Sequence, residues 1–472
     1  MRLCASIPLL LLALTAGAPP EVLDLTLQEA IALALRQNRE IKALELTLES
    51  RRLAVVGART EFEWTAHPSG NAETGKDRRT VTYGLDVARK TTWGTELTVG
   101  GQTLRDSESG SNTASRDTVV VELQQPLLRN AGPLVNREPV TRAESQVAAA
   151  RRAVELRRTD TVVQVAETFE QLFQLQRQMD YDTQALERLD RFLRLSQARE
   201  KNGRVSRVDT LRTEQQRGAA SLRLAQTREQ WRSVMADLAD LLALTPETPL
   251  SVQPAPRLTV KVTDEAAAVM EALSNRLDYA QVLHDAQDAK RGVRIARRDL
   301  LPDLRVVSRY QRAGDGDSGS QAARLDQNVW FVGLTVAGDL TLHKERIALE
   351  EAGVARQTAE LNAESLRAAL SRQVLQSLLF YNRAQKGIPA AESAYQAARS
   401  RVLLARRLFD RGRGTSTTLS DAEDELQSAE VQWLTAQSDA SVASYRLLRV
   451  LGRLIEYPED LKPAAQLPTS ND

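Results

Sequence analysis

The feature that most constrains this chain is an internal repeat. The pair Asn38-Arg39 returns as Asn275-Arg276, an offset of 237 residues, and each pair lies thirteen residues into its opening segment. Further on, Gly203-Arg204 is echoed by Gly412-Arg413 at an offset of 209, so the first copy carries about 28 extra residues. A duplicated chain of 472 residues predicts one elongated unit made of two copies, rather than several unrelated domains.

The boundaries of the copies follow from composition. Prolines at 246, 249, 254 and 256 exclude a helix or a central strand and indicate a linker. We therefore expect a first repeat over 25–245, a linker over 246–261, a second repeat over 262–456 and a flexible tail over 457–472.

The N-terminus indicates export. Arg2 precedes a short apolar run and the small residues Ala16-Gly17-Ala18, which is the layout of a secretory signal peptide. We expect this peptide to cover 1–18, although Pro19 leaves the exact cleavage position open.

Long helices are expected in both copies. Residues 140–202 contain neither Gly nor Pro and would span about 90 Å as a helix. A seven-residue apolar repeat runs along this segment, at Val165, Leu172, Met179, Leu186 and Leu193, and predicts a coiled coil. Thr26 and Glu29 form a capping-box pattern ahead of the first helix. Gly387-Ile388-Pro389 is expected to kink or end the matching long helix of the second copy.

Two segments change to the period of β-strands. Apolar residues alternate with polar or small ones in 64–125 and again in 304–338, as at Val81, Tyr83, Leu85 and Val87. Strands that alternate in this way are typical of an outer-membrane barrel, which must close on itself. So few strands from one chain predict that several copies contribute to one barrel. Residues 80–104 leave room for an additional hairpin around Trp93-Gly94, as an elaboration or as part of an enlarged barrel.

Composition excludes several functions. The 63 basic and 62 acidic residues give a net charge of +1. The chain therefore lacks the excess of basic residues that nucleic-acid binding requires. The three histidines lie in different segments, and the single cysteine, Cys4, falls within the expected signal peptide. We therefore predict no catalytic, cofactor-binding or metal-ligating residue and no enzymatic activity.

Four motifs together resemble the TolC family of outer-membrane efflux channels. They are the opening LTLQEAIALALRQNREIKA, the second opening that begins NRLDYAQVLHDAQDAKRG, the turns GRVSRVDTL and GRGTSTTLSDAEDEL, and the closing ASVASYRLLRVLG. The resemblance implies a mainly α fold with membrane β: long coiled-coil hairpins form an α-barrel, and a few strands per subunit join a shared β-barrel. In the family, a homotrimer places twelve strands in the outer-membrane lipid and twelve helices in the periplasm.

The resemblance also implies a function. Such a trimer is the passive exit duct of a tripartite efflux pump or type I secretion system, and it docks a periplasmic adaptor and an inner-membrane pump. The alternatives are a periplasmic adaptor, which would need a lipoyl-like module and no duplication, and a cell-surface coiled-coil scaffold, which would not explain the strands.

The two Gly-containing turns are the expected periplasmic tips of the helical hairpins. By resemblance, the adaptor-docking residues are Gly203, Val205, Ser206, Gly412 and Thr415. Asp421 matches an acid that narrows the family's pore, with Asp209 and Asp424 as further gate candidates. Thr418 and Gly414 stand where the family has an acid and a latching Arg, which implies a latch of different construction. Alternatively, Asp421 and Asp424 are solvated acids near a helix start, where the macrodipole favours them.

Overall fold

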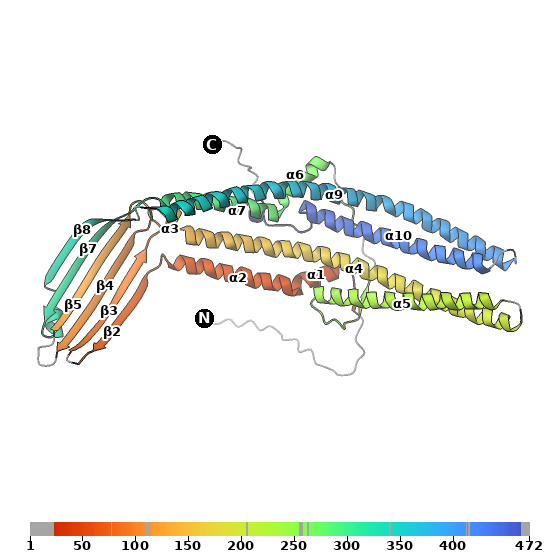
Figure 1. The fold of residues 1–472 in the computed structure, drawn as a ribbon, viewed down its shortest axis with the longest axis horizontal. Helices are drawn as coiled ribbons and strands as arrows, with labels where there is room; N and C mark the ends of the chain where they lie inside the picture. The colour runs from red at the N-terminus through yellow and green to blue at the C-terminus, as the bar shows by residue number, and fades with distance from the viewer. Residues whose placement is uncertain are drawn as a thin grey trace, which may run out of the picture. The chain divides into compact units, whose positions relative to one another are not determined.

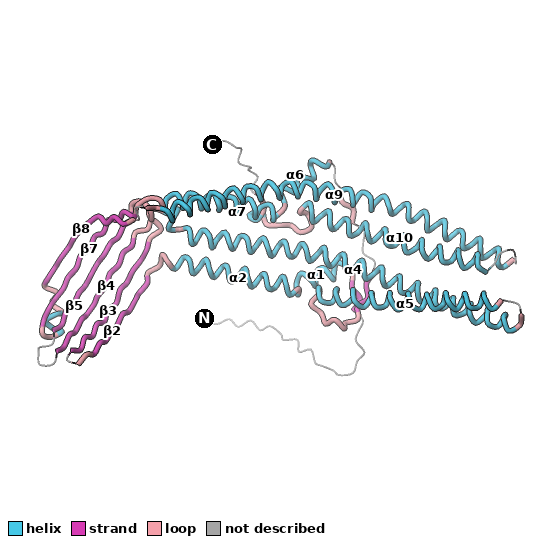
Figure 2. Tube along the Cα trace, in the orientation of Figure 1, coloured by secondary structure: helices cyan, strands magenta, loops and turns pink. Residues whose placement is uncertain are grey.

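The computed structural model describes residues 23–76, 78–108, 114–203, 206–253, 258–261, 264–338, 341–411, 413 and 416–463 (Figure 2). The chain divides into two compact units. The helical unit comprises Met1–Lys42, Arg157–Val269 and Gln373–Glu456, and the sheet unit comprises Ala43–Leu156, Met270–Arg372 and Tyr457–Asp472.

Helices dominate the described part of the chain (Figure 1). The first copy contains α1 (Leu27–Gln37), α2 (Arg39–Thr60), α3 (Pro133–Asn136), α4 (Glu138–Lys201) and α5 (Arg207–Leu241). The second contains α6 (Glu265–Asn275), α7 (Leu277–Asp299), α8 (Gly319–Ala322), α9 (His343–Asp410) and α10 (Ser416–Leu451), followed by the 3-10 helix η1 (Glu459–Leu461). None of the helices in the described ranges is both long and apolar enough to cross a membrane.

The sheet unit is built on six antiparallel strands in the order β2-β3-β4-β5-β7-β8 (Figure 1). Their bounds are β2 (Thr65–Thr74), β3 (Arg78–Lys90), β4 (Glu96–Glu108), β5 (Ala114–Pro126), β7 (Asp303–Gly316) and β8 (Gln327–Ala337). The resemblance implied four strands per subunit, but the sheet has six because the first copy supplies four of them. The segment around Gly94, with φ +87°, forms the turn between β3 and β4.

The register gives this sheet two different faces. Val87 pairs with Val99, Val99 with Val121 and Val121 with Tyr310, and side chains of paired residues share a face. The apolar face continues in both directions and ends on β8 at Trp330, Val332, Leu334 and Val336. The opposite face is more polar, with residues such as Thr82, Asp86, Gln102, Glu122 and Arg309. Its ladder includes an ion pair between Glu122 and Arg309.

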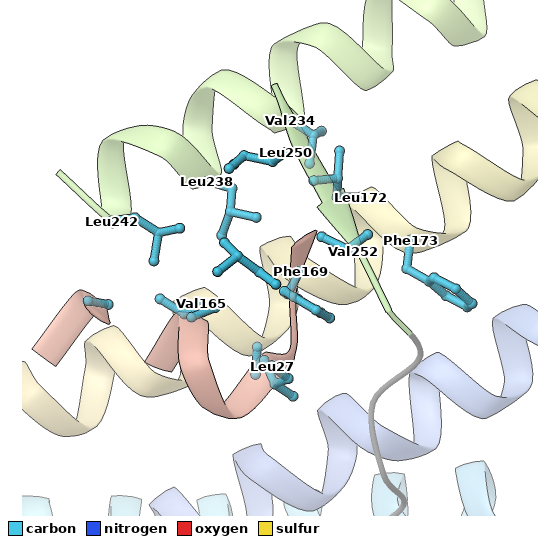
Figure 3. Close-up of a cluster of buried hydrophobic side chains, with 14 of the residues drawn as sticks. Leu27, Val165, Phe169, Leu172, Phe173, Val234, Leu238, Leu242, Leu250 and Val252 are labelled. Atoms are coloured by element: carbon cyan, nitrogen blue, oxygen red, sulfur yellow. The ribbon is translucent and has the colours of Figure 1, made fainter. Parts of the chain in front are cut away.

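The helical unit has a well-packed apolar core (Figure 3). The seam residues Val165 and Leu172 of α4 are fully buried, together with Phe169. They pack with α1, α5, α10 and the two-stranded parallel sheet of β1 (Leu23–Leu25) and β6 (Leu250–Val252). At about 1.5–3 kcal/mol for each large apolar side chain, this cluster is a major source of the unit's stability.

The ends of the helices agree in part with the expectations from sequence. The capping box is confirmed, since the Glu29 N–H donates to Thr26 Oγ1 at 3.3 Å and the Thr26 N–H to Glu29 Oε2 at 2.9 Å. By contrast, α9 does not end at Pro389 but continues to Asp410. Ile388 is buried beside the exposed Pro389, and packing of this side chain favours helix where the proline alone would disfavour it.

The segment expected to be a flexible tail begins with an ordered turn. Leu461 in η1 is 2% exposed. The Arg152 Nε donates to its carbonyl at 3.3 Å, and Arg151 pairs with Asp460 at 2.7 Å.

Candidate functional site

The first hairpin, formed by α4 and α5, reverses at Gly203. This glycine has φ +67°, a backbone conformation that residues other than glycine rarely adopt. Its N–H donates to the Glu200 carbonyl at 2.9 Å. Ser206 is the N-cap of α5, where its Oγ accepts from the N–H of Val208 at 3.1 Å and of Asp209 at 3.4 Å. Val205, a predicted docking residue, lies outside the described residues.

The second hairpin, formed by α9 and α10, is described up to its turn. Gly412, Gly414 and Thr415 lie outside the described residues. Beside the turn, the buried Val402 and Ala405 of α9 pack against Ala422 of α10. This small apolar seam fixes which way α10 faces.

Packing of Ala422 against Val402 and Ala405 turns the predicted acids of α10 away from α9. Ala422 is fully buried, whereas its neighbour Asp421 and Asp424 one turn further on are exposed. Asp209 is exposed in the first turn of α5. The structure therefore puts all three gate candidates on solvated helix surface near the ends of the two hairpins.

A contact between α4 and α10, which the sequence did not predict, joins the two hairpins near the acids. Arg188 of α4 reaches α10, where its Nε lies 3.7 Å from Glu423 Oε2 and its Nη2 lies 3.7 Å from Asp424 Oδ1. The same Nη2 donates to Gln427 Oε1 at 3.2 Å. Since 235 residues separate Arg188 from Glu423, no local pattern could have revealed the contact.

Charge is concentrated around this arginine. Glu423 also accepts from Arg406 Nη2 at 3.1 Å, and Glu425 pairs with Arg401 of α9. Partial burial raises the pKa of Asp424, and the nearby carboxylates of Asp421 and Glu423 raise it further, while Arg188 acts in the opposite direction. The Asp424 side chain is still 70% exposed, so water screens these interactions strongly.

Comparison with known proteins shows what the chain is similar to. Residues 268–453 match the family model described as "Outer membrane efflux protein". The second copy thus carries the pattern of this family, and the chain resembles TolC-like outer membrane channels. A curated relative, "Outer membrane efflux protein BepC" of Brucella suis biovar 1 (strain 1330), is 23% identical over 352 residues, which are 71% of this chain and 72% of BepC.

Solved structures share the fold. The outer membrane protein VceC of Vibrio cholerae has a TM-score of 0.67 at 17% identity, over 90% of this chain and 96% of VceC. The Campylobacter jejuni CmeC outer membrane channel has a TM-score of 0.69 at 12% identity, over 91% of this chain and 86% of CmeC. These structures confirm the predicted fold class. The family-model match and BepC agree with the predicted family and outer-membrane location.

Proposed function

We propose that this outer membrane efflux protein is a homotrimeric, passive exit duct that works with a periplasmic adaptor and an inner-membrane pump. The observation that carries the proposal is the duplicated architecture. Each copy contributes a hairpin of long helices and strands of one shared sheet, and the sheet has an exposed apolar face. An apolar sheet face suits lipid, and polar-faced helices suit the walls of an aqueous tunnel.

The duct would do no chemistry. In the described ranges no group of three or more His, Cys, Asp or Glu is arranged to hold a metal ion. In this proposal, transport draws its energy from the inner-membrane partner. A periplasmic adaptor is the weaker alternative because it offers no reason for two copies or for a wide apolar sheet face.

The free ends of the two hairpins are the proposed docking points for the adaptor. Gly203 and Ser206 form the first tip, and Gly412 and Thr415 belong to the second, with Val205 in the first turn. The sharp turn at Gly203 and the cap at Ser206 fix the shape of the first tip. Each structural repeat, 25–245 and 262–456, therefore carries one tip.

The gate is proposed to consist of an acidic ring and a latch. Three copies of Asp421, with Asp424 and Asp209 nearby, would give the periplasmic opening a negative potential that attracts cations. Arg188 would be the latch, since it binds Glu423 and Asp424 across the two hairpins. It replaces the arginine that the family carries where this chain has Gly414.

The experiment is a conductance measurement on purified protein. We expect outer-membrane fractionation, a detergent-corrected mass of three chains and small single-channel currents in planar bilayers. Arg188→Ala should raise the conductance severalfold, because each subunit loses the contacts that Arg188 makes between the hairpins near their tips. The matched control is Arg191→Ala on the same helix, since Arg191 makes only a 3.8 Å pair with Glu187 within α4. A monomer confined to the soluble periplasm would refute the duct, and equal conductance of both variants would refute the latch.

A further inference from the structure

The two outer strands of the six-stranded sheet have free edges. Every residue of β2 after Thr65 is exposed, and so are ten of the eleven residues of β8. An unpaired edge leaves backbone N–H and C=O groups without partners, and in lipid each such group costs several kcal/mol. For a sheet of the outer membrane, both edges therefore require a covering strand.

We propose that β8 of one subunit pairs with β2 of the next, so that three copies close an eighteen-stranded barrel. The inference rests on the homotrimer proposed above and goes beyond it, because a family-type trimer would have twelve strands. The strand number is consistent with closure. Six strands in strict alternation leave β2 and β8 running in opposite directions, so their pairing continues the antiparallel pattern.

The lengths of the two edges fit one another. β2 has ten residues and β8 has eleven. Full-length antiparallel pairing places Ala337 opposite the partner subunit's Thr65, and Asn328 opposite the partner subunit's Thr74. The backbone groups of β2 that point to the free edge, which belong to every second residue, then face β8 along the whole length of the strand.

This register also gives the tilt that a barrel needs. Within one subunit, the ladder that begins at Thr65 reaches Phe331 on β8, by way of Ala88, Thr98, Glu122 and Arg309. Pairing Thr65 with Ala337 therefore shifts the chain by six residues per subunit. Six residues are ~20 Å along the strands and six strand spacings are ~29 Å across them, a slope equal to a tilt of about 35°. Closed barrels have tilts of roughly 35–45°.

The side chains along the seam are complementary in size and face. An even shift keeps each face continuous, so Trp330, Val332, Leu334 and Val336 of β8 stay on the apolar side. Opposite them on the partner's β2 stand small or compact residues, namely Ala72, Gly70, Pro68 and Ala66. The large side chains of β8, which are 61–74% exposed, would thus lie over the small ones of the neighbouring strand.

Pro68 modifies one position of the seam. The Gly75 N–H bonds to the Arg78 carbonyl at 2.7 Å, and the alternation of an antiparallel ladder then turns the backbone groups of Pro68 toward the free edge. Proline has no N–H, which confines it to edge strands. In this register one carbonyl, that of Leu334, would lack a donor from the ladder while the others have one.

The consequence is a wider outer-membrane pore. Barrel diameter grows roughly linearly with strand number, and barrels of 16–18 strands enclose aqueous channels. Eighteen strands would give about one and a half times the diameter of the family's twelve-stranded barrel. The membrane end of this duct would then accept bulkier cargo, with the narrowing left to the helical end.

Disulfide cross-linking tests the seam. Ser69→Cys with Gly333→Cys places two cysteines opposite one another in the proposed register, on the polar face, at a pair of the closer type with Cα atoms ~4.5 Å apart. A Cβ at Gly333 meets no atom within 4 Å, so the sheet tolerates the substitution. Within one subunit the two positions lie on opposite edges, about 24 Å apart, so any disulfide between them must join two chains.

We expect the oxidised double variant to run as a covalent trimer on denaturing, non-reducing gels and as a monomer after reduction. The matched control, Ser69→Cys with Val329→Cys, keeps the same face but is four residues out of register and should stay uncrosslinked, as should each single variant. If the protein is a trimer in detergent but S69C/G333C forms no cross-linked species, or only the control does, the proposed β8–β2 pairing is wrong. The exit-duct proposal would then still stand. A monomer in detergent would overturn both proposals.

Discussion

At the scale of single residues, the proposed gate combines residues that the sequence predicted with one that it did not. Asp421 and Asp424 could be nominated because the second turn resembles that of the TolC family, and a turn motif is a local property of the sequence. Arg188 could not, since its role depends on how two hairpins pack. Its contacts with Glu423 and Asp424, both at 3.7 Å, are long and partly exposed to water, so each is individually weak, at about 0.2–1 kcal/mol. A latch of this kind suits a gate that must open.

The acidic ring predicts cation selectivity. Asp421→Ala should lower the preference of the channel for cations and raise its conductance, because three negative charges leave the opening together. The measurement is the reversal potential of single channels under a KCl gradient, with block by divalent cations as a second readout. Glu425→Ala is the control, since Glu425 is neutralised by Arg401 of α9. Unchanged selectivity in Asp421→Ala would remove this residue from the ring.

A buried carboxyl makes stability depend on pH. Glu170 of α4 is 5% exposed, and the Ser438 hydroxyl of α10 donates to its Oε2 at 2.8 Å. Burial raises the pKa of Glu170 above the ordinary value of 4.5. Because the folded pKa is the higher one, this contribution to stability is full below pH 4.5 and is lost as the pH rises through the folded pKa.

Glu170→Gln should therefore melt a few degrees above the wild type at pH 7–8, since it removes the buried charge and keeps an acceptor for Ser438. At pH 4 the two proteins should melt alike. Thermal unfolding followed by circular dichroism across this pH range provides the measurement. Glu167→Gln, one turn away and bound to Arg446 at 2.6 Å, is the control and should gain nothing. A melting difference that does not vary with pH would contradict the assignment.

At the scale of elements, the sequence predicted what local patterns encode. The period of seven identified the buried seam at Val165 and Leu172, and the period of two identified strands in both copies. The number of strands was left open, because glycine-rich turns such as that at Gly94 are compatible with several pairings. The sequence predicted a kink or an end at Gly387-Ile388-Pro389; α9 does not end there but continues to Asp410, and Ile388 is buried. Packing between distant segments decides such cases.

The break between α1 and α2 shows why the first copy has an asparagine at position 38. Asn38 is 4% exposed. Its Oδ1 accepts from the N–H groups of Glu40 at 3.0 Å and Ile41 at 3.2 Å, and its Nδ2 donates to the Leu241 carbonyl of α5 at 3.1 Å. One side chain thus starts α2 and ties it to the end of α5.

Asn38→Ala should destabilise the helical unit by about 1–3 kcal/mol, because it removes a helix cap and leaves a buried carbonyl unpartnered. Asn38→Asp keeps the acceptor for the cap but loses the donor to Leu241, so an intermediate loss is expected. Urea unfolding of the purified protein would rank the three forms. Equal stability of the wild type and Asn38→Ala would show that water replaces both contacts.

At the scale of the whole molecule, the near-zero net charge conceals two kinds of surface. Charged residues cover the long helices, where ion pairs such as Arg446–Glu167 and Arg449–Asp160 join α10 to α4. The sheet separates an apolar face from a polar one, and an outer-membrane location predicts that the first faces lipid and the second faces the lumen. That assignment can be tested on two neighbouring residues of the same type.

Val121 and Val120 are adjacent on β5 and point to opposite faces. Val121 pairs with Val99 and Tyr310 on the apolar face, whereas Val120 pairs with Gly100 and Gln311 on the other. Val121→Arg should cost about 2–4 kcal/mol per subunit if it lies near the bilayer midplane, and should sharply reduce the yield of folded trimer in the outer-membrane fraction. Val120→Arg is the matched control and should assemble nearly normally, because its charge meets water in the lumen. Equal yields from the two variants would remove the assignment of the faces. A larger loss in Val120→Arg would reverse it.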